Sequence, residues 1–366
     1  MINKKSVLFV ITSLNTGGAE RVLVDTLNRL AHEKMEYKYT ILTVYSDGLL
    51  EKELDKKIEV KHLFNISKPS RIGMKIIGLI LRCKRLKSIL IKRQINLDDY
   101  DKVIAYIEGT PVNICKDFKN KKISFIHTDI SKHFKNKNKI KILDEYLNYE
   151  KIVCISEGIK KDFIDFLPEK YKHLEKRTKV IYNYIDVNRI KKLSREGLCN
   201  KEQEEYFLVI ARLRKEKGVL RLLDVFKNRK EKLVIIGDGP LYEEMKNIIN
   251  TENIKNIHLL GNMKNPYTYL KHARALIIPS YYEGYSMVAK EAEILNKFVI
   301  STKTNVEEAL RNYKYKLIDD NLENGISEFI NKKENDYLED IKENSESRVE
   351  KEFNIHVEDF KNEIYS

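Results

Sequence analysis

Short apolar runs alternate along the chain with longer segments whose apolar residues recur at the spacing of a helix face. Val7–Ile11 is one such run, and after a short loop Leu23 and Leu27 follow at helical spacing. An alternation of strand and helix predicts a parallel sheet covered by crossover helices, and therefore an α/β fold. The predicted strands are Val7–Ile11, Tyr39–Val44, Ile58–Val60, Val103–Tyr106, Ile123–Ile126, Lys151–Ile155, Lys179–Tyr182, Tyr206–Ala211, Lys232–Ile236, Ile257–Leu260, Ala275–Ile278 and Phe298–Ser301.

The pattern stops once and starts again, which predicts two domains. Residues 188–205 are polar and charged, and a new series of strands begins at Tyr206. A chain of 366 residues is long enough for two domains of ordinary size, each with its own core. We expect the first domain to comprise residues 1–186 and the second residues 187–366, with the last helix crossing back to the first domain.

The sequence indicates neither a membrane-spanning helix nor a framework of metal ligands or disulfides. It has no apolar run of the roughly 18 residues that a spanning helix needs. The apolar stretch Val7–Ile11 is interpreted as a core strand, because no cleavage-site pattern follows it. The four cysteines are far apart and have no paired spacing, which fits a reducing, cytoplasmic setting.

The net charge of +13 is concentrated in the first half of the chain. Residues 1–186 contain 37 basic and 24 acidic residues, whereas residues 187–366 contain 31 of each. A genome that favours lysine would make both halves basic, so this bias does not explain the asymmetry. The first half is therefore expected to meet an anionic partner: a membrane surface, a lipid diphosphate or a nucleic acid.

The basic excess is densest between Val60 and Leu97, where no acidic residue occurs. Basic and apolar residues interleave there, and four basic residues fall on one stripe at helical spacing: Lys75, Arg82, Arg85 and Lys92. A packed helix with a solvated charged face would show the same pattern, but the missing acids favour a basic amphipathic helix on a membrane. Near an anionic bilayer each basic group contributes about 1 kcal/mol. Residues 132–141 add a second basic stretch, expected to be a loop.

Residues 275–295 carry the clearest candidate site. The apolar run Ala275–Ile278 predicts a buried strand, and Ser286 is the expected N-cap of a helix that continues to Leu295. Glu283 lies on the loop before this helix, and Glu291 lies about one and a half turns inside it. The first N–H groups of a helix have no partner within the helix, so this arrangement can bind an anion.

With this Glu-x7-Glu spacing the chain resembles the retaining, nucleotide-sugar-dependent glycosyltransferases of the GT-B fold, of the type grouped as glycosyltransferase family 4. Two companions extend the resemblance over nearly the whole chain, Gly17-Gly18-Ala19-Glu20-Arg21 and the pair Arg212 and Lys217. The resemblance implies two Rossmann-like domains whose parallel sheets face a central cleft. It also implies transfer, with retention, of a hexosyl or N-acetylhexosaminyl group from a UDP-sugar in the synthesis of capsule, exopolysaccharide or another cell-surface glycan.

The resemblance further implies roles for residues of the second domain. Arg212 and Lys217 would bind the donor diphosphate, on which negative charge builds as the sugar leaves. Glu283 would be catalytic, by bonding a sugar hydroxyl or by stabilising positive charge on the anomeric carbon, and Glu291 would bind the ribose. Backbone contacts to phosphates or sugar are expected from Tyr285, Ser286 and Met287, and contacts to the base from Asn262 and Met263.

In the first domain the resemblance points to the loops after two strands. Gly17 and Gly18 let the backbone approach a ligand closely at a helix N-terminus and would face the donor diphosphate. His127 follows the strand Ile123–Ile126, at the end where open α/β sheets bind ligands, and would touch the transferred sugar or the acceptor. Two cations and a helix N-terminus can replace a divalent metal, so neither a metal nor a cofactor is expected.

The expected partners are a nucleotide-sugar donor, a lipid-linked or oligosaccharide acceptor and an anionic membrane surface, with no nucleic acid. This would place the protein in the cytoplasm, peripherally on the inner face of the cell membrane. Two alternatives stay open. A nucleotide-sugar epimerase of the same fold would change the donor without any acceptor. A non-catalytic protein that binds anionic surfaces would bind no nucleotide.

Overall fold

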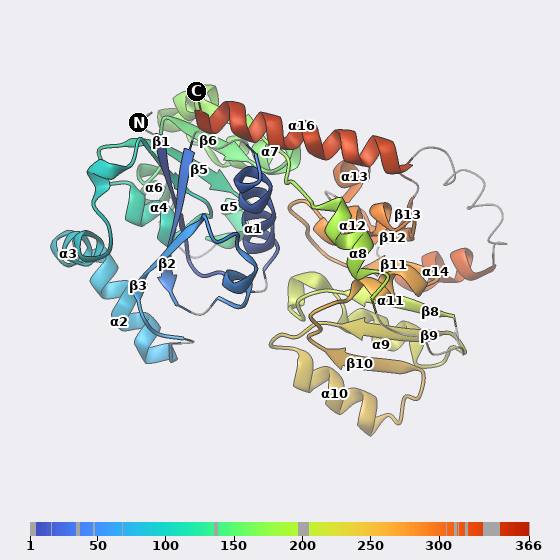
Figure 1. The fold of residues 1–366 in the computed structure, drawn as a ribbon. Helices are drawn as coiled ribbons and strands as arrows, with labels where there is room; N and C mark the ends of the chain where they lie inside the picture. The colour runs from blue at the N-terminus through green and yellow to red at the C-terminus, as the bar shows by residue number, and fades with distance from the viewer. Residues whose placement is uncertain are drawn as a thin grey trace. The chain divides into compact units, whose positions relative to one another are not determined.

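The computed structural model describes residues 5–15, 17–33, 37–46, 48–67, 69–134, 138–196, 205–304, 306–310, 313, 315–318, 321–331 and 345–365. The chain forms two compact units. One comprises Met1–Ile185 together with Phe353–Ser366, and the other comprises Asp186–Glu352. Each unit contains a parallel sheet and its crossover helices (Figure 1), so the predicted α/β class is confirmed.

The sheet of the first unit has seven strands in the order β3-β2-β1-β4-β5-β6-β7, and all neighbouring strands are parallel. The interior strand β1 is buried from Val7 to Ile11, as expected for a parallel strand covered on both faces. The strands are β1 Lys5–Ile11, β2 Tyr37–Tyr45, β3 Glu59–Phe64, β4 Lys102–Ala105, β5 Lys121–Ile126, β6 Lys151–Cys154 and β7 Thr178–Val180.

Local signals in the sequence explain where helices of the first unit begin and which face they bury. Helix α7 starts at Ser156, whose hydroxyl accepts a hydrogen bond of 3.1 Å from the N–H of Ile159. Helix α1 buries the apolar stripe that includes Leu23 and Leu27. The helices are α1 Gly18–Ala31, α2 Arg71–Arg82, α3 Lys84–Gln94, α4 Thr110–Cys115, α5 Ile130–His133, α6 Lys139–Asp144 and α7 Glu157–Phe166, with 3₁₀ helices Leu49–Glu53, Leu97–Asp99 and Glu169–Arg177.

The end of the last helix, α16 Ser345–Tyr365, belongs to the core of the first unit. Phe360 stacks on Phe9 of β1, with ring centroids 6.3 Å apart. Two ion pairs flank this contact: Lys361 lies 2.8 Å from Glu33, and Glu363 lies 2.7 Å from Lys151. Residues far from β1 in sequence thus complete the packing around it.

The second unit repeats the plan with a six-stranded parallel sheet in the order β10-β9-β8-β11-β12-β13. Its strands are β8 Tyr206–Ile210, β9 Lys232–Ile236, β10 Ile257–Gly261, β11 Ala275–Ile278, β12 Phe298–Thr302 and β13 Tyr315–Ile318. Its helices are α8 Val187–Leu193, α9 Leu220–Phe226, α10 Tyr242–Thr251, α11 Tyr267–His272, α12 Met287–Ile294, α13 Val306–Ala309 and α14 Leu322–Asn331, with the 3₁₀ helix Lys215–Lys217.

The prediction of one basic amphipathic helix between residues 60 and 97 is wrong, because the segment forms two helices. Cys83 ends α2 and precedes α3 with an extended backbone, at φ −77° and ψ 107°. The stripe from Lys75 to Lys92 is therefore interrupted at Cys83. On α2 itself Ile72, Ile76 and Leu79 are exposed by 71%, 52% and 64%, and at this spacing they share one face.

Two further expectations need correction. The basic stretch 132–141 is not simply a loop, because α5 and α6 cover its two ends; residues 135–137 lie outside the described residues. The edge strand β13 was not predicted, since it has four residues and a half-buried pattern.

In the described part of the chain no helix is long and apolar enough to cross a membrane.

Candidate active site

The candidate site of the second unit lies where the strand order of the sheet reverses. Strand β8 has β9 on one side and β11 on the other, so the loops after β8 and β11 diverge from neighbouring positions. Open α/β sheets bind ligands in the crevice at this kind of switch point, beyond the carboxyl ends of the strands. The loop after β8 carries Arg212 and Lys217, and the loop after β11 carries Glu283.

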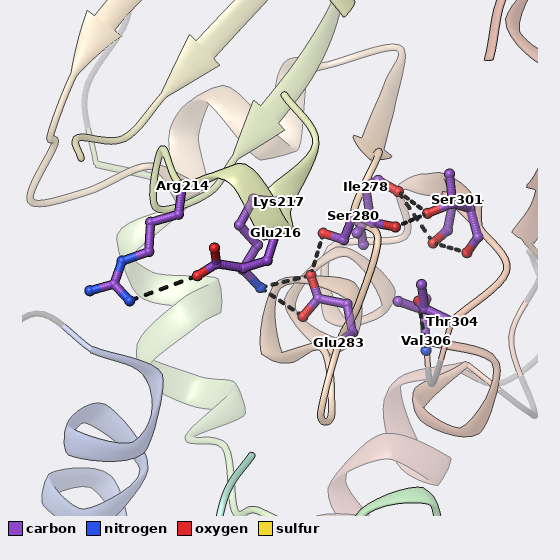
Figure 2. A network of polar contacts seen from close by, with 10 residues as sticks. Arg214, Glu216, Lys217, Ile278, Ser280, Glu283, Ser301, Thr304 and Val306 are labelled. Atoms are coloured by element: carbon purple, nitrogen blue, oxygen red, sulfur yellow. Dashed lines mark hydrogen bonds and ion pairs between the residues drawn. The ribbon is translucent and has the colours of Figure 1, made fainter. Parts of the chain in front are cut away.

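Lys217 and Glu283 are in direct contact (Figure 2). The ammonium Nζ lies 2.8 Å from both carboxylate oxygens of Glu283. Ser280 donates a third hydrogen bond, of 2.6 Å, to Oε1 of the same carboxylate. The side chain of Glu283 is only 9% exposed, whereas that of Lys217 is 29% exposed. A buried carboxylate is thus compensated by a cation that still reaches solvent.

Backbone contacts hold the two loops together. Tyr281 donates its N–H to the carbonyl of Glu216 at 2.9 Å. Gly218 has a positive φ of 63°, and a Cβ at this position would lie 2.0 Å from the carbonyl oxygen of Pro279. Only glycine fits such a close approach of two backbones in this conformation. The side chain of Arg221 adds a hydrogen bond to the same carbonyl. These contacts fix Lys217 against the loop that carries Glu283.

Arg212 is exposed, and its guanidinium has no hydrogen-bonding or ionic partner among the residues that the structure describes. Its backbone is nevertheless fixed, because Leu213 donates to the carbonyl of Asp238 at 2.9 Å. Gly237, with φ 145°, belongs to the turn between β9 and α10 that packs against this segment. The neighbouring Arg214 is engaged with Glu216 at 3.7 Å (Figure 2), which leaves Arg212 as the free guanidinium of this loop.

Helix α12 begins at Ser286, as predicted, but the hydroxyl does not cap the helix. Its Oγ is buried and has no hydrogen-bond partner among the described residues. A buried hydroxyl without a partner costs free energy unless a ligand supplies one. The flanking residues Tyr285 and Met287 are buried and half-buried. The start of α12 thus presents a polar atom for which the described residues provide no acceptor.

Glu291, inside α12, is hydrogen-bonded by the first residue of helix α11, Tyr267. Tyr267 donates its hydroxyl to Oε1 of Glu291 at 3.0 Å. Burial, and then the Glu291 carboxylate, raise the pKa of Tyr267 above its ordinary value, so the phenol stays protonated as a donor. The segment before Tyr267 contains Asn262, which is exposed, and Met263, which is half-buried. The structure therefore brings Glu291 to the start of helix α11, which follows the loop after β10.

In the first unit His127 lies at the carboxyl end of β5 and is buried. The carboxylate of Glu108 accepts hydrogen bonds from the His127 N–H at 3.0 Å and from the Thr128 hydroxyl. Burial lowers the pKa of His127 below its ordinary value, against the opposing effect of Glu108, so the ring is neutral at neutral pH. Its Nε2 has no hydrogen-bond partner among the described residues.

Sequence reasoning missed Glu108. It is buried and holds the loop that carries His127. The available signal was a lone acid three residues after the end of the buried strand β4 and directly before Gly109, which has a positive φ of 86°. A single glutamate has no diagnostic spacing, so its role becomes visible only once β4 and β5 are paired.

Gly17 is the N-cap of α1, and Gly18 is its first residue. A Cβ on Gly17 would lie 1.9 Å from Oε2 of Glu20, so this carboxylate folds back over the start of the helix. The Glu20 carboxylate would repel an anion bound there unless the side chain moved away. This repulsion opposes the predicted contact of Gly17 and Gly18 with the diphosphate. In the described residues no group of three or more His, Cys, Asp or Glu side chains could hold a metal ion.

Residues 191–348 match a family model described as "Glycosyl transferases group 1". The chain is 29% identical over 235 residues to an uncharacterized glycosyltransferase of Methanocaldococcus jannaschii, a match that covers 61% of this chain and 53% of that protein. The chain thus spans about half the length of that relative.

A second relative matches more of the chain. It is a Campylobacter jejuni protein named N-acetylgalactosamine-N,N'-diacetylbacillosaminyl-diphospho-undecaprenol 4-alpha-N-acetylgalactosaminyltransferase. The identity is 26% over 308 residues, covering 80% of this chain and 79% of that protein. Among solved structures, Anabaena HepE in complex with UDP and glucose superposes with a TM-score of 0.74 and 17% identity, over 98% of this chain and 99% of that one. At this identity the likeness shows a shared fold.

Proposed function

Because the chain belongs to the glycosyltransferases of the GT-B fold, we propose that it transfers a sugar from a UDP-linked donor to a lipid-linked saccharide, with retention at the anomeric carbon. The observation that carries this proposal is the contact of Lys217 with Glu283 at the switch point of the second sheet. A phosphate-binding cation and a carboxylate are there held within one hydrogen bond of each other.

The chemistry requires both groups. As the bond between the anomeric carbon and the diphosphate oxygen breaks, its electron pair stays on the departing diphosphate and positive charge develops on the sugar. Fixed cations lower the barrier because they stabilise the charge that appears on the leaving group. An ammonium has three N–H donors, so Lys217 can bond Glu283 and a phosphate oxygen together. Arg212 supplies a planar fork for further phosphate oxygens.

Glu283 then lies beside the reacting sugar, where it stabilises the positive anomeric centre or bonds a hydroxyl. The acceptor hydroxyl forms the new bond to the anomeric carbon and gives its proton to the oxygen of the departing diphosphate. Ser286 and the backbone N–H groups at the start of α12 are proposed to bind the phosphates, and the neutral ring of His127 to bond a sugar or acceptor hydroxyl. Gly17 and Gly18 are proposed to approach the same ligands.

Recognition of the nucleoside is assigned to Glu291 and to the loop with Asn262 and Met263. The hydroxyl of Tyr267 occupies one oxygen of Glu291 and so orients the carboxylate, whose other oxygen suits a ribose hydroxyl. A UDP donor is favoured by analogy with HepE, whose structure contains UDP. The sugar is proposed to be a hexose or an N-acetylhexosamine, by analogy with the Campylobacter relative.

The proposed acceptor is lipid-linked, and the proposed site of action is the inner face of the cell membrane. The name of the Campylobacter relative specifies a diphospho-undecaprenol-linked substrate. In this chain the exposed apolar face of α2 lies in a segment without acidic residues, a combination typical of helices that lie in the membrane interface.

A direct test offers the protein a panel of UDP-sugars with and without a polyprenyl-diphosphate-linked saccharide. We expect UDP release that depends on the acceptor, and a product whose new linkage has the donor's anomeric configuration by NMR. Change of the donor without acceptor would instead indicate an epimerase. Absence of any thermal stabilisation by UDP would indicate a protein that binds anionic surfaces without catalysis, and either result would overturn the proposal.

Glu291→Gln is expected to raise the KM for the donor about tenfold while kcat changes little. The amide keeps an acceptor for Tyr267, but a neutral group forms weaker hydrogen bonds to the ribose than a carboxylate does. Steady-state kinetics with varied donor measures the effect, and Glu244→Gln, on the exposed face of α10, is the matched control. An unchanged KM would remove Glu291 from the ribose site.

The double variant Ile72→Ser/Leu79→Ser is expected to weaken binding to phosphatidylglycerol-containing vesicles by roughly tenfold or more, because each side chain loses apolar area that the bilayer would bury. Vesicle co-sedimentation measures the partition coefficient. The control is Leu49→Ser/Ile355→Ser, which removes two apolar side chains exposed by 57% and 60% outside α2. Equal binding of both double variants would contradict a role for α2.

A further inference from the structure

A cavity of about 350 Å³ opens in the first unit, separate from the residues assigned above. This volume lies in the usual range for ligand pockets, about 300–1,000 Å³. Its walls come from the end of α2, the start of α4, and α6 with its preceding residue Asn138. Helix α4 follows β4 and the α5–α6 region follows β5, so the cavity belongs to the carboxyl edge of the sheet. That edge is where such sheets bind ligands.

Two cations line this cavity and have no partner among the described residues. Arg82, in the last turn of α2, and Lys141, in α6, are both exposed. In the described parts of the chain neither side chain has a hydrogen-bonding or ionic partner. Glu145, the one acid among the described residues of the lining, is already engaged, since Asn113 donates to it and Lys116 lies 3.7 Å from it. The cavity therefore carries positive charge that the described residues do not compensate.

The apolar face of α2 begins directly beside this charge. Leu79 precedes Arg82 by three residues, so the two side chains are neighbours on the helix surface. Ile76 and Ile72 continue the exposed apolar face away from the cavity. A ligand with an anionic head and a long apolar chain matches both features, because the head compensates the two cations while the chain covers the helix face.

The same loops place the cavity next to the candidate catalytic histidine. Gly109 lines the cavity and follows Glu108, whose carboxylate bonds the backbone of His127. Phe134, also in the lining, ends the short helix α5 that begins three residues after His127. A diphosphate in the cavity would thus put a sugar attached to it within reach of the loop that carries His127.

We propose that this cavity binds the diphosphate of the lipid-linked acceptor, with Arg82 and Lys141 contacting its oxygens and the lipid chain lying along Ile72, Ile76 and Leu79. The inference rests on the proposed function, which it deepens by giving the acceptor a binding site in the first unit. Charge-assisted hydrogen bonds between cations and phosphates are among the strongest available to a protein.

The test uses farnesyl diphosphate as the probe, with saturating UDP present so that the donor site cannot capture the diphosphate. We expect wild type to bind the probe in calorimetry, and Arg82→Ala/Lys141→Ala to bind it at least tenfold more weakly. Lys75→Ala, which removes an equivalent charge from α2 outside the cavity, is expected to change the Kd less than twofold. Thermal unfolding and UDP affinity should be unchanged in all variants, since these side chains are exposed.

Three outcomes would overturn the inference. The double variant could bind the probe as wild type does, inorganic diphosphate could bind as tightly as farnesyl diphosphate, or phosphatidylglycerol vesicles could displace the probe with equal efficiency. The second result would indicate a site for free phosphates, and the third a general membrane surface. Failure of wild type to bind any UDP-sugar would instead refute the proposed function. Binding of UDP-sugars is measured in a separate titration without the probe.

Discussion

Lys217→Ala is expected to lower kcat at least about a hundredfold and to destabilise the second unit. Catalysis falls because the departing diphosphate loses a fixed donor in the position where charge develops. Stability falls by about 1–3 kcal/mol, because Glu283 keeps the bond from Ser280 but loses both bonds to the ammonium while its side chain stays buried. Transfer kinetics and denaturant unfolding measure the two effects separately.

A second substitution distinguishes the two roles of Lys217. In Lys217→Ala/Glu283→Gln the unpaired charge is removed, so stability should return towards that of wild type while transfer stays low. Lys215→Ala, in the same 3₁₀ helix and exposed, should change neither quantity strongly. If Lys217→Ala retains most of its transfer activity, the assignment of the donor site to this switch point is wrong.

Gly218→Ala is expected to destabilise the second unit by about 2 kcal/mol or more and to reduce transfer with it. The position requires a positive φ, which strains any residue with a Cβ, and the added Cβ would collide with the carbonyl of Pro279. Because the collision is with backbone, relief requires the loop after β11 to move, and Glu283 would move with it. Denaturant unfolding and transfer kinetics on the same preparation measure both losses.

Gly78→Ala is the matched control for this substitution. Gly78 lies within α2, and a Cβ there would meet nothing within 4 Å. Alanine at a helical position is favoured over glycine, so the first unit should gain about 0.5–1 kcal/mol. Similar stability of Gly218→Ala and wild type would mean that the two loops are not held together by this close approach.

Most strands of the two sheets were predictable because they are short apolar runs. Ala275–Ile278 was placed at its observed bounds, since Pro279 ends the run at once. Strand β13 was not predicted because Tyr315 and Lys316 interrupt its apolar character. The break between α2 and α3 at Cys83 was not predicted for a different reason. Neither glycine nor proline marks it, and the basic pattern continues in the same composition on both sides.

The members of the candidate site were easier to predict than their contacts. Lys217 and Glu283 each stand in a recognisable position after a strand, but they are 66 residues apart. Their hydrogen bonds depend on β8 and β11 being neighbours, which the order of elements along the chain does not state. The donation from Tyr267 to Glu291 is of the same kind, since it joins helix α11, which follows β10, to helix α12, which follows β11.

The bond between Tyr281 and Glu216 has an evolutionary consequence. It joins an amide to a carbonyl, and every amino acid except proline can supply the amide. Side chains on the loop after β11 can therefore diverge to suit different sugars while the positions of the lysine and the glutamate persist. One scaffold can in this way serve a diverse set of donors. The close approach of the two loops requires a particular residue only at Gly218.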